Sequence, residues 1–140
     1  MSSSSIIIFV ILLGSVTPST RFHVNGILSC SLEQFWCFLI ELREIDTLRV
    51  TDDRIDTFGG KCTYQPSYDY ELKGVQDGDG FKNKEYEIGV TIKHNCTLIK
   101  GHIRKVSLPV FYESVDAETF VFTWNLKLAQ NGALVEDYWS

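Results

Sequence analysis

Apolar and polar residues alternate along several segments of the chain. In residues 119–128, for example, Phe120, Phe122 and Trp124 recur at every second position. A period of two, built from aromatic and β-branched residues, is typical of a strand that buries one of its faces. The pattern predicts strands over residues 23–30, 35–42, 86–94 and 119–128.

Three shorter apolar runs, over residues 61–64, 68–72 and 103–110, complete the predicted strands. Pro109 marks an edge position or the end of its strand, because proline has no N–H for a ladder. Residues 65–67 suit a tight turn, and residues 74–84 read as a polar loop. The sequence therefore predicts an all-β domain, a two-sheet sandwich of about seven to eight strands that is immunoglobulin-like in outline.

The N-terminal segment follows a different pattern. Residues 2–5 are serines, residues 6–13 are continuously apolar, and residues 14–20 are mainly small and polar. This is the layout of a secretory signal peptide, although the usual Lys or Arg before the apolar core is missing. The apolar run is too short for a transmembrane span, which needs roughly 20 residues, and a buried strand is the alternative. We expect a signal peptide over residues 1–19, one domain over residues 20–140, and a mature N-terminus between Val16 and Phe22.

The charge balance limits the classes of partner that the chain can be expected to bind. The chain of 140 residues has 13 Lys and Arg against 18 Asp and Glu, which gives a formal net charge of -5. Binding to nucleic acid requires basic patches, and so does non-specific attachment to anionic lipid. We therefore expect no nucleic-acid partner.

All four cysteines lie after the predicted signal peptide, at Cys30, Cys37, Cys62 and Cys96. An even number of cysteines in an exported chain indicates disulfides, and the spacing alone leaves three connectivities open. A zinc site is the alternative, but the C-x-x-C knuckle that usually marks one is missing. We expect no metal site and no cofactor.

Several short motifs follow one another in a recognisable order. Residues 24–30 read V-x-G-x-L-x-C, residues 38–44 form an apolar strand that ends in Glu44, and an acidic pair follows at Asp52 and Asp53. Residues 70–74 are similar to F-x-L-x-G, residues 94–96 to H-x-C, and residues 104–109 to R-K-V with an apolar-Pro step. This order resembles the nematode transthyretin-like family over nearly the whole mature chain.

The resemblance implies a secreted sandwich of the transthyretin (prealbumin) type. It also implies a disulfide between Cys30 in the first strand and Cys96 in the H-x-C motif. Cys37 and Cys62 then remain as a second pair, which the family pattern does not include. Each bridge would close a long loop and contribute roughly 3–4 kcal/mol on the chain-entropy model.

Related enzymes of the transthyretin fold hydrolyse 5-hydroxyisourate with histidines, an arginine and a C-terminal Tyr-Arg-Gly-Ser. His23, His102 and Arg104 are the candidates here, because a histidine beside an arginine can act as a general base near an anion. The chain ends instead in Glu-Asp-Tyr-Trp-Ser. We therefore expect no such hydrolysis and no catalytic residues, and all three histidines of the chain are expected at strand ends or on the surface.

Two further features bear on candidate sites. Asp77 and Asp79 form one acidic loop, and Asp46, Asp52, Asp53 and Asp56 form another, but solvated turns use the same residues as calcium loops. Asn95-Cys96-Thr97 is an N-glycosylation sequon, in which the central cysteine lowers efficiency. Calcium binding and a glycan on Asn95 are both left open.

The sequence thus predicts a secreted, non-enzymatic extracellular binding protein. Its partner would be an extracellular protein, a lipid-like ligand or a cell surface, and the oligomeric state is open. The alternatives are the transthyretin-fold hydrolase, a carrier of hydrophobic ligands of the thyroid-hormone type, and a structural extracellular component without a saturable ligand.

Overall fold

The computed structural model describes residues 19–45, 53–77, 85–109 and 111–136. These residues form strands and connecting loops without a helix, so the all-β prediction is confirmed. The strands are β1 (Ser19–Ser29), β2 (Trp36–Glu44), β3 (Asp53–Thr63), β4 (Ser67–Asp77), β5 (Glu85–His94), β6 (Ile103–Ser107), β7 (Phe111–Ser114), β8 (Thr119–Thr123), β9 (Leu126–Lys127) and β10 (Ala133–Val135).

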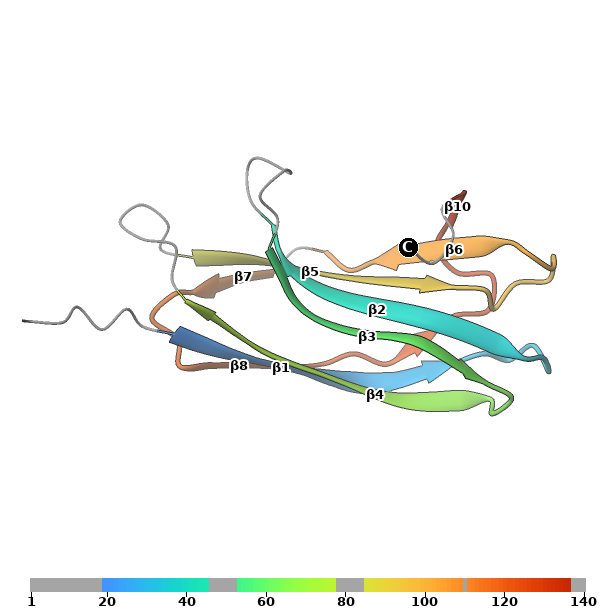
Figure 1. Cartoon of the computed structure of the whole chain (residues 1–140), viewed down its shortest axis with the longest axis horizontal. Coiled ribbons are helices and arrows are strands. Elements are labelled where there is room, and N and C mark those ends of the chain that lie inside the picture. Colours follow the sequence, from blue (N-terminus) through green and yellow to red (C-terminus); the bar gives the residue numbers. More distant parts are fainter. Residues whose placement is uncertain (1–18, 46–52, 78–84, 110, 137–140) are drawn as a thin grey trace, which may run out of the picture.

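The described strands form two sheets that face each other (Figure 1). Sheet A has the order β4-β1-β8, and β9 also pairs with β1. Sheet B has the order β10-β6-β5-β2-β3, and β7 also pairs with β5. β1 runs antiparallel to β4 and parallel to β8 and β9. The predicted two-layer architecture is therefore present.

The described strands number ten, more than the seven to eight predicted, because β7 and β10 were not predicted and one predicted strand is interrupted. The predicted strand 103–110 ends earlier, as β6, and β7 begins beyond its predicted end. These two strands pair with successive parts of β5. Pro109, which cannot donate a ladder hydrogen bond, lies between them. The predicted strand 119–128 is the interrupted one: it divides into β8 and β9, which both pair with β1.

The interruption between β8 and β9 depends on Gly26 of β1. At Trp124 the chain leaves the ladder, and a Cβ atom at Gly26 would collide with the Trp124 carbonyl oxygen. That carbonyl accepts a hydrogen bond of 2.8 Å from the Tyr70 hydroxyl, and burial raises the pKa of Tyr70 to about 12. The glycine thus allows the Trp124 carbonyl to approach β1 closely and to reach the Tyr70 hydroxyl of β4.

The predicted apolar faces meet between the two sheets. Three strands bury alternate residues almost completely: Phe22, Val24 and Leu28 in β1, Trp36, Phe38, Ile40 and Leu42 in β2, and Tyr86, Ile88, Val90 and Ile92 in β5. The intervening residues of β2, including Cys37 and Glu41, lie on the outer face. Within the described part of the chain, no helix is long and apolar enough to cross a membrane.

The prediction was wrong for the acidic segment before Lys61. Asp53 and Asp56, predicted in a loop, lie in β3, and residues 74–77, also predicted in a loop, lie in β4. β3 is an edge strand of sheet B, and edge strands carry charged residues because one side faces solvent. The Asp56 carboxylate accepts a 2.7 Å hydrogen bond from the Lys73 backbone N–H, which joins β3 to β4 between the sheets.

Candidate binding surface at the disulfide-linked end

Four loops meet at one end of the sandwich, on the right in Figure 1. They are residues 30–35 between β1 and β2, 64–66 between β3 and β4, 95–102 between β5 and β6, and 128–132 between β9 and β10. We call this region the disulfide-linked end. Loops position binding groups on a rigid scaffold in many proteins, so the rigidity of this end is the first property to establish.

A disulfide joins Cys30 to Cys96 at this end. The Cα atoms are 5.9 Å apart, and the two residues are only 3% and 0% exposed. The bond connects the end of β1 in sheet A to the end of β5 in sheet B. The second bond joins Cys37 to Cys62, which face each other in the β2–β3 register. The first pair is the one that the transthyretin-like resemblance implied, and the second is the pair that then remained.

Hydrogen bonds tie three of the four loops to one another. Gln34 Nε2 donates to the carbonyl oxygens of Asn95 and Thr97, both at 3.3 Å. The Leu98 N–H donates to Gln130 Oε1 at 2.8 Å, and the Gln130 N–H donates to the Cys96 carbonyl. These bonds fix loops that are far apart in the sequence to a common frame.

The turn 64–66 is anchored to the same frame. Trp36, which is 1% exposed, donates from Nε1 to the Gln65 carbonyl at 2.8 Å. The Cys30 N–H donates to the Pro66 carbonyl at 2.9 Å. The buried indole therefore holds a turn whose own side chains lie in solvent.

His94 supports the end from inside the core. It is fully buried, its Nε2 donates to the Asn131 carbonyl at 3.0 Å, and its Nδ1 accepts from the Cys96 N–H at 3.2 Å. Burial lowers the pKa of His94 to about 4. The hydrogen bond to Asn131 opposes this shift, and the nearby positive charge of Arg104 adds to it. His94 ends β5, as the prediction of a strand-end or surface residue allowed, and it is buried. Its even spacing with the buried residues of β5 was the available signal.

The outer surface of this end is apolar. Phe35, Tyr64, Leu98 and Ile99 are 48%, 79%, 73% and 58% exposed. The rings of Phe35 and Tyr64 lie against each other with their centroids 4.6 Å apart. We call these four side chains the apolar tip. Loops held by a disulfide and several hydrogen bonds thus present large apolar groups to solvent.

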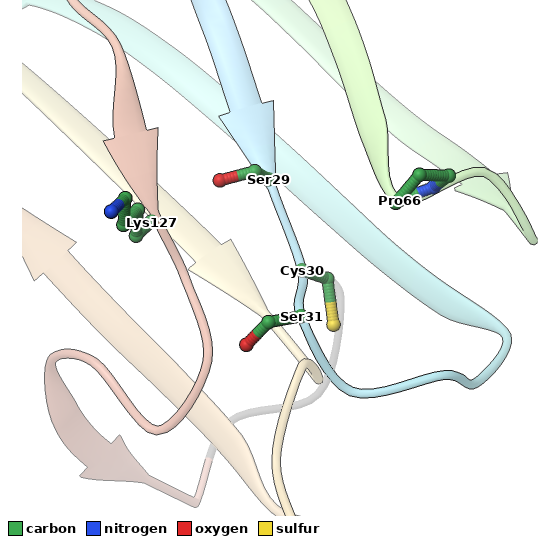
Figure 2. A pocket seen from close by; sticks show the side chains of 5 residues that line it. All are labelled: Ser29, Cys30, Ser31, Pro66 and Lys127. Atoms are coloured by element: carbon green, nitrogen blue, oxygen red, sulfur yellow. The ribbon is translucent and has the colours of Figure 1, made fainter.

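Two shallow depressions lie beside the apolar tip. One, of about 520 Å³, is lined by Cys30, Gln34, Tyr64 and Pro66 among others. The other, of about 350 Å³, is lined by Ser29, Cys30, Ser31, Pro66 and Lys127. Figure 2 shows Lys127 and Pro66 on opposite sides of the segment from Ser29 to Ser31. The two depressions share Cys30, Ser31 and Pro66.

The candidates for hydrolysis are not brought together. His23 lies on the outer face of sheet A, where its Nε2 is 2.7 Å from Glu71 Oε1. Hydrogen bonds from Lys73 and then His23 lower the pKa of the Glu71 carboxyl. Arg104 lies in sheet B and donates to the Gly132 carbonyl at 2.6 Å, and His102 precedes β6 in the loop 95–102. The structure thus separates His23 from Arg104 by placing them in different sheets.

The acidic loops are only partly described. Asp46, Asp52 and Asp79 lie outside the described residues, and Asp77 ends β4. The Asp53 carboxylate accepts a 3.4 Å hydrogen bond from Gln76 Nε2. Among the side chains that the structure describes, no group of three or more His, Cys, Asp or Glu residues could hold a metal ion.

Asn95 has a structural role in this end. Its Oδ1 accepts a hydrogen bond of 2.7 Å from the Cys37 N–H, and its own N–H donates to the Cys37 carbonyl. The sequon residue Thr97 is 3% exposed, and its hydroxyl donates to the Ile99 carbonyl at 2.8 Å. Glycosylation of Asn95 stays a prediction, at a position whose side chain already holds β2 to the loop 95–102.

Comparison with known proteins shows relatives from a nematode. A family described as Caenorhabditis elegans protein of unknown function (DUF870) matches residues 25–134. An uncharacterized Caenorhabditis elegans protein, B0416.7, is 29% identical over 114 residues, which cover 78% of this chain and 84% of that protein. No solved structure matches the chain. The family match covers both sheets and the disulfide-linked end, and the chain therefore belongs to the Caenorhabditis elegans family DUF870.

Proposed function

We propose that the chain is a secreted, non-enzymatic extracellular binding protein of the transthyretin-like type, which binds a partner protein through the apolar tip. The observation that carries the proposal is the exposure of Phe35, Tyr64, Leu98 and Ile99 on loops that a buried disulfide fixes. Exposed aromatic residues are enriched at protein interfaces. Fixed loops also lose little conformational entropy on binding.

Two observations support an extracellular location. Both disulfides occur in a chain whose N-terminal residues have the layout of a signal peptide. Disulfides persist in oxidising compartments and are rare in the cytosol. The two-sheet architecture is in turn what the transthyretin-like resemblance requires.

A protein suits this surface better than a small ligand does. Drug-sized ligands are usually buried to more than about 70% in a concave site, whereas the apolar tip projects outward from its loops. Glu33, Gln34 and Lys100 provide polar groups beside the exposed apolar ones. An apolar centre with a polar rim is the usual anatomy of a protein interface.

The test is capture of partners from the extracellular fluid of the source organism, with identification by mass spectrometry. The bait variants are the double substitution Tyr64→Ser with Leu98→Ser, and Tyr112→Ser as the control. Tyr112 is 63% exposed and lies in β7, away from the disulfide-linked end. We expect a saturable partner that binds the wild type and the control and binds the double variant at least tenfold more weakly.

Two results would contradict the proposal. A partner that binds the double variant as tightly as the wild type would place recognition elsewhere. Turnover of 5-hydroxyisourate that is lost in His23→Ala or Arg104→Ala would show that the non-enzymatic assignment is wrong.

A further inference from the structure

β8 has one open edge. On its paired side, the Arg21 N–H donates to the Glu118 carbonyl at 3.0 Å, and the Trp124 N–H donates to the Asn25 carbonyl at 2.8 Å. Backbone N–H and C=O groups point to alternate sides along a strand. The backbone groups of Thr119, Val121 and Thr123 therefore point away from β1. Within the described residues, β8 pairs with β1 alone.

The sequence of β8 lacks the features that normally protect an edge. Proteins prevent unwanted pairing at edge strands with charged residues, prolines and β-bulges. β3, at the edge of sheet B, has charged residues and register shifts against β2. β8 reads Thr-Phe-Val-Phe-Thr, with no charge, proline or glycine. Its edge is thus suited to accept another strand.

The side chains at this edge are incompletely covered. Phe120 and Phe122 point toward the core but are only partly buried, and so is Phe111 of β7, whose ring centroid is 4.7 Å from that of Phe122. On the outer face, Val121 is 62% exposed. A strand added to this edge would extend sheet A over the partly exposed aromatic rings.

The five residues of β8 read the same in both directions. We propose that the chain forms a symmetric dimer in which β8 pairs antiparallel with β8 of a second copy. A two-fold axis through Val121 places Val121 opposite its own copy and Thr119 opposite Thr123 of the partner subunit. Symmetric dimers bury the same surface patch on both subunits, and a palindromic, uncharged strand matches itself in such a pairing.

This pairing also satisfies the open backbone groups. The outward-pointing N–H and C=O groups belong to Thr119, Val121 and Thr123. The two-fold axis places these groups opposite the outward-pointing groups of the second copy. Each opposed pair then exchanges both of its N–H···O=C hydrogen bonds. On the inner face, Phe120 lies opposite Phe122 of the partner subunit, which brings aromatic side chains together across the strands.

The experiment measures the molar mass of the secreted chain by light scattering during size exclusion, over a range of concentrations. Val121→Lys sets two ammonium groups beside each other at the two-fold axis. Val75→Lys is the matched control, because Val75 is 59% exposed on β4 of the same sheet. We expect dimers for the wild type and the control, and at least tenfold weaker dimerisation for Val121→Lys. A monomeric wild type at 0.1 mM, or an equally dimeric Val121→Lys, would overturn the proposal.

Amide hydrogen exchange in the wild type gives a second measurement that does not depend on the folding of a variant. If β8 pairs with its copy, the amides of Val121 and Thr123 exchange slowly at high concentration and faster on dilution. The Phe122 amide, which faces β1, should respond much less. Concentration-independent fast exchange at Val121 would count against the proposal. The double substitution at Tyr64 and Leu98 should leave the dimer intact. The dimer and the binding of a partner at the apolar tip can therefore be tested independently.

Discussion

At the scale of single residues, burial changes the chemistry of a few side chains. Burial disfavours the charged form of His94 and lowers its pKa, and in the neutral form Nδ1 accepts a hydrogen bond from the Cys96 N–H. Gly26 leaves room for the Trp124 carbonyl, which a larger residue would displace. Neither effect requires a ligand, and each can be tested by one substitution.

The first prediction concerns acid stability. The folded state lowers the pKa of His94 to about 4 from an ordinary value of 6.5, so the unfolded chain binds the proton more readily. The contribution of neutral His94 to the free energy of unfolding is complete above about pH 6.5 and is lost as the pH falls toward 4. We expect urea denaturation to show a loss of up to about 3 kcal/mol across this window.

The control for this prediction is a second histidine substitution. His94→Gln should lower stability at neutral pH and flatten the pH dependence, whereas His102→Gln, in the loop 95–102, should leave the slope unchanged. An unaltered slope in His94→Gln would mean that another group causes the loss.

The second prediction concerns Gly26→Ala. The added methyl group would meet the Trp124 carbonyl and disturb its hydrogen bond with the Tyr70 hydroxyl. Overpacking of this kind costs about 1–3 kcal/mol, which thermal unfolding can measure. Gly60→Asn is the control, because no atom lies within 4 Å of a Cβ there and asparagine tolerates its φ of 63°. A loss in the control as large as that in Gly26→Ala would refute the steric explanation.

At the scale of elements, the strands predicted from the sequence pattern differ from the observed strands mainly at the sheet edges. The central strands β2 and β5 bury one face, so alternation identified them. β3 pairs with a neighbouring strand on one side only, and its sequence mixes charged residues with glycines. It therefore lacks a clear alternation, and the pattern identified only its last residues. Local pairing also decides how the two disulfides differ: one is buried between sheets, and the other lies on the surface of one sheet.

The third prediction concerns these disulfides. Cys62 is exposed and Cys37 partly exposed, whereas Cys30 and Cys96 are buried. Thiol–disulfide exchange requires access of the attacking thiolate to sulfur. Under mild reduction of the folded protein, we expect alkylation of Cys37 and Cys62 well before Cys30 and Cys96, as measured by peptide mapping. Earlier labelling of Cys30 would contradict the burial of that bond.

The stability of the cysteine variants should follow the same division. Loss of the bond between Cys30 and Cys96, which closes 66 residues, should cost about 4 kcal/mol on the chain-entropy model, and loss of the 25-residue bond somewhat less. Cys30→Ser should also loosen the loop 95–102, whereas Cys37→Ser should affect β3. Amide exchange in the two variants would show whether these regions respond separately.

At the scale of the whole molecule, the disulfide-linked end combines four loops from all parts of the sequence. Its rigidity depends on both sheets, and so does the proposed dimer, because β8 is at an edge only in the assembled sandwich. The N-terminus is also constrained at this scale, since β1 begins at Ser19 and Thr20 is buried, with its hydroxyl donating to the Ala117 carbonyl at 2.6 Å.

The fourth prediction concerns processing. Cleavage between Val16 and Phe22 was expected from the sequence, and β1 narrows this to a site that leaves Ser19 in the chain. N-terminal sequencing of secreted protein should therefore begin between Val16 and Ser19. Material that begins at Met1 would show that the segment is retained. Material that begins after Thr20 would show that the first pairs of β1 with β4 are dispensable.

The sequence by itself determined the all-β class, the buried faces of the long strands and the presence of disulfide-bonding cysteines. These features follow from the two-residue period of a strand and from residue chemistry, both of which are local. Only the tertiary structure decided that β3 continues through an acidic segment, that β8 and β9 separate at Gly26, and that His94 is buried. It also decided that Phe35, Tyr64, Leu98 and Ile99 gather at one end, because contacts between residues far apart in the chain arise from the packing of two sheets and leave no local pattern.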